Sequence, residues 1–432
     1  MGGAFGNLGI GASALQAEER LMAAVGANVA NTSTPGYRRQ DVTLSEQEGG
    51  GVATTQIQRA SDPPLEQAVL AGIGAQGEAA ARADVLSETQ NIFPGPSGAG
   101  FGTALNDFWS AWQSVANNPT SVPARQQVLS TASVLAARFQ SAALQLTQLQ
   151  EQVGAQQSAG ITQVNGLLAQ IASLNKRIGG TTAGLGRNTL ENEQSGLVEQ
   201  AAALVGIQSQ RQSNGTLVLY NGGTEIVSAS GQPANLTVVA GTPRWSGGSP
   251  AAGGSIGGQQ VAEGSLGGYF SNLNALANTV MSHVNNAQAR GYDLNGNVGQ
   301  NLFTGSSAAT MAVSSTMTVD GLAASTSGAA GDGANAQAVA DLGGIGTGSI
   351  AQQLAGYVSA TGSDVQQAQE DQTASSQQLA GIRTLGQSAW GASLNTQAVA
   401  MTEAQRSYQA AAIYVQTQGQ MLNSLIQAMA NA

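Results

Sequence analysis

The chain contains one histidine, His283, and no cysteine, so few combinations of its residues could bind a metal ion. A protein zinc site normally takes several His and Cys side chains, with an occasional carboxylate. A single imidazole in the segment HVNNAQARG cannot supply such a ligand set. We therefore expect His283 to have a structural or solvent-exposed role, and we predict no metal and no organic cofactor for this chain.

The segment DLNGN at 293–297 starts like a calcium-binding loop. Asp293, Asn295 and Asn297 have the spacing of the first three oxygen ligands of such a loop. The later ligands are missing, as is the glutamate that normally binds Ca²⁺ with both oxygens. The interpretation that fits this segment is a turn after Gly291, the residue expected to end the preceding helix.

Acidic and basic residues do not form a recognisable catalytic motif. Paired carboxylates can hydrolyse glycosidic bonds, but acids are sparse here and none lies in a context that predicts a raised pKa. No glycine-rich loop ends in Lys-Ser or Lys-Thr, since Lys176 is the one lysine in the sequence. Arg38 and Arg39 are too few to form a phosphate-binding patch. We predict that the chain is not an enzyme.

The composition restricts the class of protein further. The 432 residues, enough for about two to four domains, carry 15 basic and 25 acidic side chains and a net charge of −10. Nucleic-acid binding is not expected, because no basic surplus exists to displace counterions from phosphates. Charged residues make up 9% of the chain, against roughly 25% in ordinary domains. A surface with so few charges is weakly protected against self-association.

The sequence also allows predictions about membrane insertion and about export from the cell. It has no run of 18 or more apolar residues, so we predict no insertion into a membrane. The first residues, MGGAFGNLGIG, lack the basic region of a cleavable secretory signal. If the protein leaves the cell, we expect it to use another route.

Both ends of the chain carry heptad patterns typical of helices that pack on another helix. We predict one continuous helix from Leu379 to Met429, roughly 75 Å long, and expect it to pair with the N-terminal helix in a coiled coil. Two separate core helices are the alternative. The positions with the heptad spacing, which we call the terminal stripe, are Leu8, Leu15, Met22, Val29, Leu394, Met401, Tyr408, Val415, Leu422, Ile426 and Met429.

Helical patterns also fill most of the middle of the chain. Asp62 followed by two prolines predicts the start of a helix that runs to about Ile92, where PGPSG at 94–98 ends it. The longest pattern has an eleven-residue step from Val153 to Val164, which relaxes a supercoil without breaking the helix. The further helices are expected over 103–118, from Pro123 to about Ile178, and over about 263–290.

A segment with β-rich runs interrupts these helices. TLVLY, EIVSA and NLTVVA are separated by SNG, NGG and SGQP turns, which predicts an inserted β-meander. MAVSSTMTV at 311–319 suggests another hairpin, followed by a Gly-rich loop to about 348. The predicted fold is mainly α with a β insert. Its parts are a terminal coiled-coil domain (1–48 plus 385–432), a long-helix bundle with a β-hairpin (49–205 plus 262–384) and a small β-rich domain (206–261).

The segment NVANTSTPGYRRQ at 28–40 ends the first predicted helix. Residues 31–34 can bond to their own backbone, Pro35 lacks an N–H group, and Gly36 permits a positive φ. A generic turn explains these residue types. It does not explain Tyr37 or the two arginines that follow.

This segment resembles the N-terminal signature of the bacterial flagellar axial proteins, which comprise rod, hook and hook-associated proteins. In that family an Asn-x-x-Asn pair ends the first helix before a Thr-Pro-Gly-Tyr turn. Asn28, Asn31, Thr34, Pro35, Gly36 and Tyr37 occupy those places. Arg39 and Gln40 narrow the resemblance to the hook-associated proteins at the first junction between hook and filament.

The resemblance covers most of the chain. Similar segments occur in the same order, at 105–129, 164–178, 273–303, 331–342 and 406–426. One segment departs from the family pattern: GASLNTQ at 391–397 stands where an acidic cluster usually precedes the closing helix. That departure puts fine contacts with neighbouring subunits in doubt.

The resemblance implies a structural protein that joins hook and filament and assembles through its terminal helices. The partners it implies are copies of the chain, the hook protein, the second junction protein, and a cytoplasmic export chaperone at the C-terminal helix. The implied location is the extracellular flagellum, reached by flagellar type III export. Two alternatives remain at this point: another axial protein, such as a hook or distal rod subunit, and a secreted glycan hydrolase.

Overall fold

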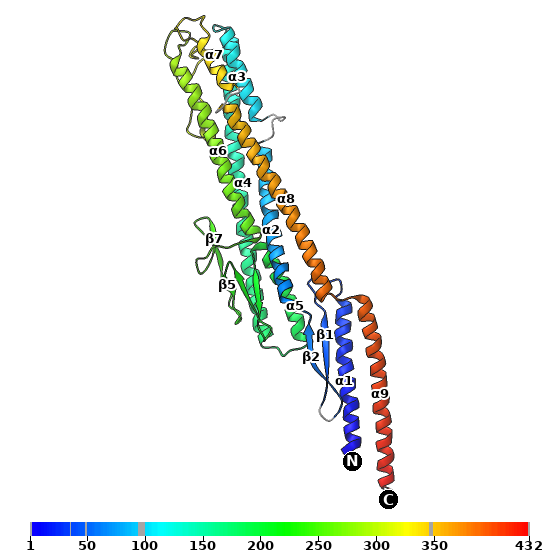
Figure 1. Cartoon of the computed structure of the whole chain (residues 1–432). Coiled ribbons are helices and arrows are strands. Elements are labelled where there is room, and N and C mark those ends of the chain that lie inside the picture. Colours follow the sequence, from blue (N-terminus) through cyan, green and yellow to red (C-terminus); the bar gives the residue numbers. More distant parts are fainter. Residues whose placement is uncertain (1, 35, 48–49, 94–99, 345–348, 431–432) are drawn as a thin grey trace. The chain divides into compact units, whose positions relative to one another are not determined.

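The computed structural model describes residues 2–34, 36–47, 50–93, 100–344 and 349–430, and most of them are helical (Figure 1). The chain forms two compact units. Unit 1 comprises 1–77, 160–256 and 374–432, and unit 2 comprises 78–159 and 257–373. The fold class, mainly α with a β insert, is confirmed. The predicted three-part division is finer than these two units and stays a prediction.

In unit 1, the two ends of the chain lie side by side as an antiparallel pair of helices, α1 (Gly2–Ala30) and α9 (Leu394–Ala430) (Figure 1). A side chain at Gly11 would meet Val415, and one at Gly26 would meet Met401. These small residues let the helices approach closely. Pairing between the two ends was predicted from the heptads, and the structure confirms it.

A β-hairpin packs on α1 and was not predicted. Its strands β1 (Gln40–Glu46) and β2 (Val52–Arg59) pair antiparallel, with Gln40 opposite Arg59. The backbone N–H of Val52 donates to the Ser13 hydroxyl on α1, at 3.2 Å. Strand β1 begins at Gln40, the last residue of the motif at 28–40, so the hairpin is held against α1 together with the motif.

Four helices contribute residues to both units: α2 (Pro63–Ile92), α4 (Val122–Gly179), α6 (Gly254–Arg290) and α8 (Ile350–Trp390). Helix α2 begins where the Asp-Pro-Pro sequence predicted, and the Asp62 carboxylate accepts the N–H of Leu65 at 3.1 Å. Helix α4 runs without a break through the eleven-residue step, as predicted. The segment 94–98, expected to end α2, lies outside the described residues.

The predicted continuous helix from Leu379 to Met429 is wrong, because residues 391–393 separate α8 from α9. The Gly391 N–H still bonds to the Gln387 carbonyl at 2.9 Å, and a Cβ at Gly391 would lie 2.3 Å from that oxygen. Only glycine fits this backbone without displacement. The apolar spacing continues across the break, so periodicity alone could not locate it.

The β insert of unit 1 packs on α4 through asparagine side chains. Asn165 donates to the Leu236 carbonyl and accepts the Leu236 N–H, both at 2.8 Å. Asn175 binds both backbone groups of Leu217 in the same way. The predicted meander is two sheets: β3 (Gln208–Arg211), β4 (Leu217–Asn221) and β5 (Thr224–Val227) in one, and β6 (Leu236–Val239) and β7 (Thr242–Trp245) in the other.

Unit 2 has its own core. Helix α3 (Phe101–Asn117) contributes the fully buried Phe108 and Trp112, and Phe108 packs against Phe303 with ring centroids 5.7 Å apart. Phe303 begins β8 (Phe303–Thr304), which pairs with β9 (Ala312–Val313). The predicted hairpin at 311–319 thus supplies one strand only. A 3₁₀ turn, η1 (Ala308–Thr310), precedes β9.

The Gly-rich stretch that was expected to be a loop contains regular structure. It includes the helix α7 (Ala334–Ala340) and the 3₁₀ turn η2 (Asp341–Gly343).

Candidate assembly site

The end of α1 is closed by the motif predicted to stop it. The side chain of Asn31 donates to the Ala27 carbonyl at 2.9 Å, which satisfies one carbonyl of the last helical turn. Thr34 then bonds back to Asn31 through its backbone N–H, at 3.0 Å, and its hydroxyl, at 3.2 Å. Gly36 has φ +76°, a conformation that glycine adopts without cost. Pro35 lies outside the described residues.

Asn28 uses its whole hydrogen-bonding capacity in the interior, where it is 1% exposed. Its amide nitrogen donates to the Gln40 carbonyl at 3.0 Å and to the Gln397 side chain at 2.9 Å. Its oxygen accepts from the Gln40 N–H at 2.8 Å and from the Tyr37 hydroxyl at 3.0 Å. One side chain on α1 therefore holds the motif, the start of β1 and the first turn of α9 together.

Gln40 extends this network to α5 (Leu185–Leu204). Its side-chain oxygen accepts from Asn188 at 3.2 Å, and its nitrogen donates to the Tyr37 hydroxyl at 3.5 Å. Burial raises the pKa of the Tyr37 phenol, and the bond from Gln40 opposes that rise. Tyr37 stays neutral at physiological pH, so its hydroxyl can both donate and accept.

Arg39 binds the end of α8. Its backbone N–H donates to the Trp390 carbonyl at 2.8 Å, and its guanidinium reaches the Gly391 carbonyl at 3.5 Å. The same guanidinium makes a two-point contact with Asp41, at 2.8 and 3.2 Å, and this contact raises the Arg39 pKa. The motif thus stops α1 and also holds the chain at the break between α8 and α9.

Sequence reasoning did not select Arg38, which the structure places at the centre of the same region. Arg38 is buried, forms an ion pair with Glu66 on α2, and lies 4.3 Å from the centroid of the Trp390 ring. The arginine doublet was the available signal. The contact with Trp390 joins positions more than 300 residues apart, so no local pattern could predict it.

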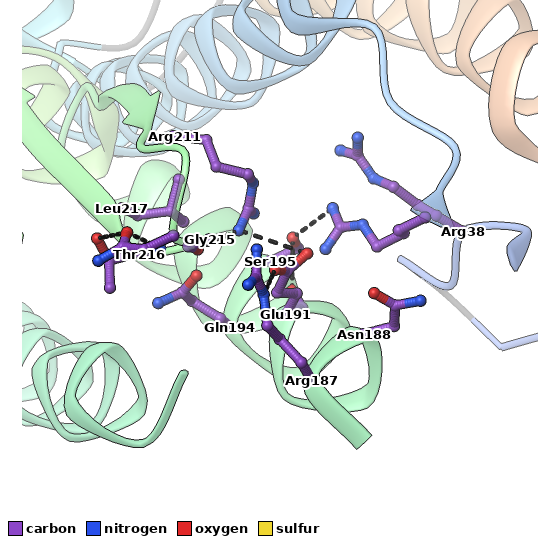
Figure 2. Close-up of polar contacts among 12 residues, drawn as sticks. Arg38, Arg187, Asn188, Glu191, Gln194, Ser195, Arg211, Gly215, Thr216 and Leu217 are labelled. Carbon is purple, nitrogen blue, oxygen red and sulfur yellow. Dashed lines mark hydrogen bonds and ion pairs between the residues drawn. The ribbon is translucent and has the colours of Figure 1, made fainter. Parts of the chain in front are cut away.

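Arginines of β2, α5 and β3 form an ionic cluster beside Arg38 (Figure 2). Arg187 and Arg211 point toward Glu191, with N–O distances of 3.0 and 3.7 Å. Arg59 donates to the Ser195 hydroxyl at 2.9 Å. Burial lowers the Arg59 pKa to about 9, and the positive charges of Arg38 and Arg211 add to that decrease. The cluster fixes the hairpin and α5 to each other.

A groove of about 780 Å³ opens beside the motif. Its walls include Thr34, Tyr37, Arg39 and Trp390, together with residues of the break before α9. Small polar residues line the motif side, and the lining also includes the apolar Val69.

The terminal stripe divides into two parts. Leu8, Leu15 and Met22 on α1, and Met401, Val415 and Leu422 on α9, are half-buried. The others are Val29, Leu394, Tyr408, Ile426 and Met429, and all of these are exposed. Ile413, 63% exposed, and Met421 extend the exposed part of α9. A large share of the apolar surface of α9 is not covered by the described part of the chain.

The residues considered for chemistry have other surroundings. His283 is exposed on α6. The Asp293 carboxylate accepts the N–H groups of Asn295 and Asn297 at 2.8 and 2.9 Å, so it closes its own turn. Within the described ranges, no three His, Asp or Glu side chains come close enough to hold a metal ion. The described helices include none with the length and apolar character to span a bilayer.

Two family models match the sequence. The helical domain of flagellar hook-associated protein FlgK matches residues 86–303, and the flagella basal body rod protein model matches residues 8–38. The first covers half of the chain. The second covers α1 and most of the motif.

Curated relatives and one solved structure are also similar. Flagellar hook-associated protein 1 of Bacillus subtilis is 28% identical over 237 residues, and that of Escherichia coli is 24% identical over 331 residues. These matches cover 50% and 67% of this chain but 45% and 58% of the relatives. The structure of the flagellar hook junction protein FlgK from Burkholderia pseudomallei, 19% identical, aligns over 74% of this chain and all of that one, with a TM-score of 0.64. This likeness shows a shared fold.

Proposed function

This chain belongs to the family of flagellar hook-associated protein FlgK, and on that premise we propose that it is a structural subunit of the junction between flagellar hook and filament. The proposal is supported by the relatives, which are hook-associated and hook junction proteins. The chain spans about half the length of these curated relatives, 45% to 58%. The segments matched by the family models are the helical domain and most of α1 with its motif.

The single observation that carries the proposal is the apolar face of α9. Exposed Ile413, Met421 and Leu425 lie within about 120° of one another around a helix that is fixed to α1 at its start by Asn28 and Gln397. Monomeric proteins rarely leave a contiguous apolar face of this kind uncovered. Neighbouring copies of the same helix pair would cover it, and the area removed from water would drive assembly.

The rod-protein match distinguishes the N-terminal helix from the helical domain. It covers residues 8–38, which build α1 and the motif turn, and does not extend into the helical domain. We infer that the terminal helices supply packing common to the axial proteins. The helical domain, which matches the hook-associated model, supplies what is particular to the junction. This favours a hook-associated role over a rod or hook subunit.

The partners follow from that role. We propose contacts with copies of the chain, with the hook protein on one side and with the second junction protein on the other. A cytoplasmic export chaperone would cover the C-terminal helix before export, since that helix exposes the most apolar residues. The proposed site of action is the extracellular flagellum, and the proposed contribution is mechanical rather than catalytic.

The proposal is tested by placing a charge in the terminal stripe. Val415→Asp and Leu422→Asp each put a carboxylate on the half-buried face of α9, where an unpaired charge opposes packing. In cells lacking the wild-type gene, we expect both variants to be lost from isolated flagella, as seen by antibody labelling in the electron microscope. Motility should be lost with them.

The matched control is Leu144→Asp on α4, because Leu144 is 57% exposed and lies in unit 2. This variant should still label the position between hook and filament. The proposed function is wrong if the wild-type chain labels another part of the flagellum, or if both α9 variants assemble normally.

A further inference from the structure

The terminal helices carry their charges within one short stretch of each helix. Over its length α1 has charged residues only at Glu18, Glu19 and Arg20, and α9 has only Glu403 and Arg406. The contacts of Gly11 with Val415 and of Gly26 with Met401 set the antiparallel register. This register brings 18–20 of α1 level with about 406–409 of α9. We call these five residues the charged belt.

No member of the charged belt has a hydrogen bond or ion pair with the described part of the chain. Four of them, Glu19, Arg20, Glu403 and Arg406, are exposed. Elsewhere in unit 1, the arginines at 38, 39, 187 and 211 all have acidic partners. The belt therefore differs from these four arginines, each of which is held by an acid of its own unit.

Glu18 adds an independent observation. Its Oε2 atom is inaccessible to solvent and has no partner among the described residues. Burial raises the pKa of its carboxyl group. A carboxylate oxygen without a donor in this position is costly, and the half-buried Glu18 side chain has to turn outward to reach a donor on a second copy.

We infer that the charged belt binds the belt of a second copy of the chain, with Glu18 and Glu19 of one copy facing Arg406 of the next. The inference rests on the proposed function, and it names the residues that set the register of the assembled helices. The second copy is the occupant favoured by charge complementarity, because each copy presents an acidic pair on α1 and a cation on α9 at the same level.

The apolar face alone does not fix how far the helices of one copy are shifted along those of the next, so another contact must set this register. Burial of Ile413, Met421 and Leu425 is non-directional, and heptad surfaces can slide past each other by a repeat. Charges confined to one short stretch make a slipped contact unfavourable, since acids would then face apolar residues or other acids. The contact is between different surfaces of the two copies, which suits a ring or helical assembly.

The test is a charge exchange between two exposed positions. Glu19→Arg and Arg406→Glu should each reduce antibody-labelled flagella by about tenfold, because each places like charges opposite one another. The combined variant E19R/R406E restores opposite charges in the reversed sense. We expect it to recover at least half of wild-type labelling.

Matched controls separate assembly from folding. Arg138→Glu reverses an exposed charge on α4 that has no ion-pair partner among the described residues, and it should leave labelling unchanged. All variants should keep the wild-type thermal midpoint within about 2 °C, as expected for surface substitutions. The inference is overturned if the single reversals assemble normally, or if the double variant stays as defective as the singles, since the belt would then face another protein. Failure of the wild-type chain to label the junction would instead reject the proposed function.

Discussion

Helices α4 and α9 carry the same heptad pattern but differ in what covers it. On α4 the apolar positions Val128, Leu135, Phe139 and Leu146 are all fully buried. On α9 the corresponding face is half-buried at best, and Ile426 and Met429 are more than half exposed. A heptad pattern therefore indicates that a helix needs a partner, without indicating whether the partner belongs to the same chain.

The polar contacts of the two helices differ as well. Asn165 and Asn175 bind strand backbones along α4, so that helix is fixed at several points within the chain. The buried polar contact of α9 with another element is at its first turn, where Gln397 meets Asn28. Beyond that turn, α9 is held by small-residue contacts with α1. Helix α9 is anchored at one end and open along the rest.

The largest expected effect on folding comes from the covered helix. Leu146→Ala deletes a fully buried side chain in the core of unit 2, and we expect a loss of about 2–5 kcal/mol in the free energy of unfolding of that unit. Urea unfolding followed by tryptophan fluorescence, with Trp109 and Trp112 in the same core, would measure it. A loss below about 1 kcal/mol would mean that α4 is not a core helix.

The next effect tests the anchor of α9. Asn28→Ala leaves the Gln40 N–H, the Tyr37 hydroxyl and the Gln397 side chain without their buried partner, which is expected to cost about 1–3 kcal/mol in unfolding free energy. Thermal unfolding would measure the loss. Ser33→Ala, at an exposed position of the same motif, should change stability little. Equal stability for both variants would show that Asn28 is not the anchor.

A smaller effect is expected from an acidic residue that is satisfied within unit 2. Asp332 accepts the N–H groups of Ala334, Ser327 and Thr326 and the Ser327 hydroxyl, and these bonds hold its pKa well below the usual range. A lowered folded-state pKa stabilises the fold above the unfolded-state pKa, near 4, and that contribution fades as the pH falls toward the folded value.

Asp332→Asn should therefore lower the thermal midpoint most at neutral pH, with the difference from wild type shrinking below about pH 4. Melting curves over that pH range would follow it. Glu18 of the charged belt makes the opposite prediction, because its pKa is raised and its carboxylate is unpartnered in the free chain. Glu18→Gln should not lower the midpoint at neutral pH. The two acids together distinguish a charge satisfied within the chain from one that is not.

The sequence predicted local features well and distant contacts poorly. The start of α2 at Pro63 and the turn at Gly36 depend on neighbouring residues, and both were found. The roles of Arg38 and Gln397 depend on partners hundreds of residues away or on another helix, and no local pattern contains them. The break at Gly391 was missed because one glycine among 58 carries no signal by itself.

The smallest effect on folding is expected from the open face of α9, and it completes the comparison with α4. Ile413 is 63% exposed, and isoleucine and serine have similar helix propensities, so Ile413→Ser should change the unfolding free energy by no more than about 0.5 kcal/mol. The same variant should reduce incorporation into flagella, because it removes apolar area that a neighbouring copy would cover. A loss of about 2 kcal/mol or more in the free chain would mean that this face packs on the chain itself. Unchanged incorporation would mean that no neighbouring copy covers Ile413. The open face of α9 would then be exposed to solvent in the assembled state as well as in the free chain.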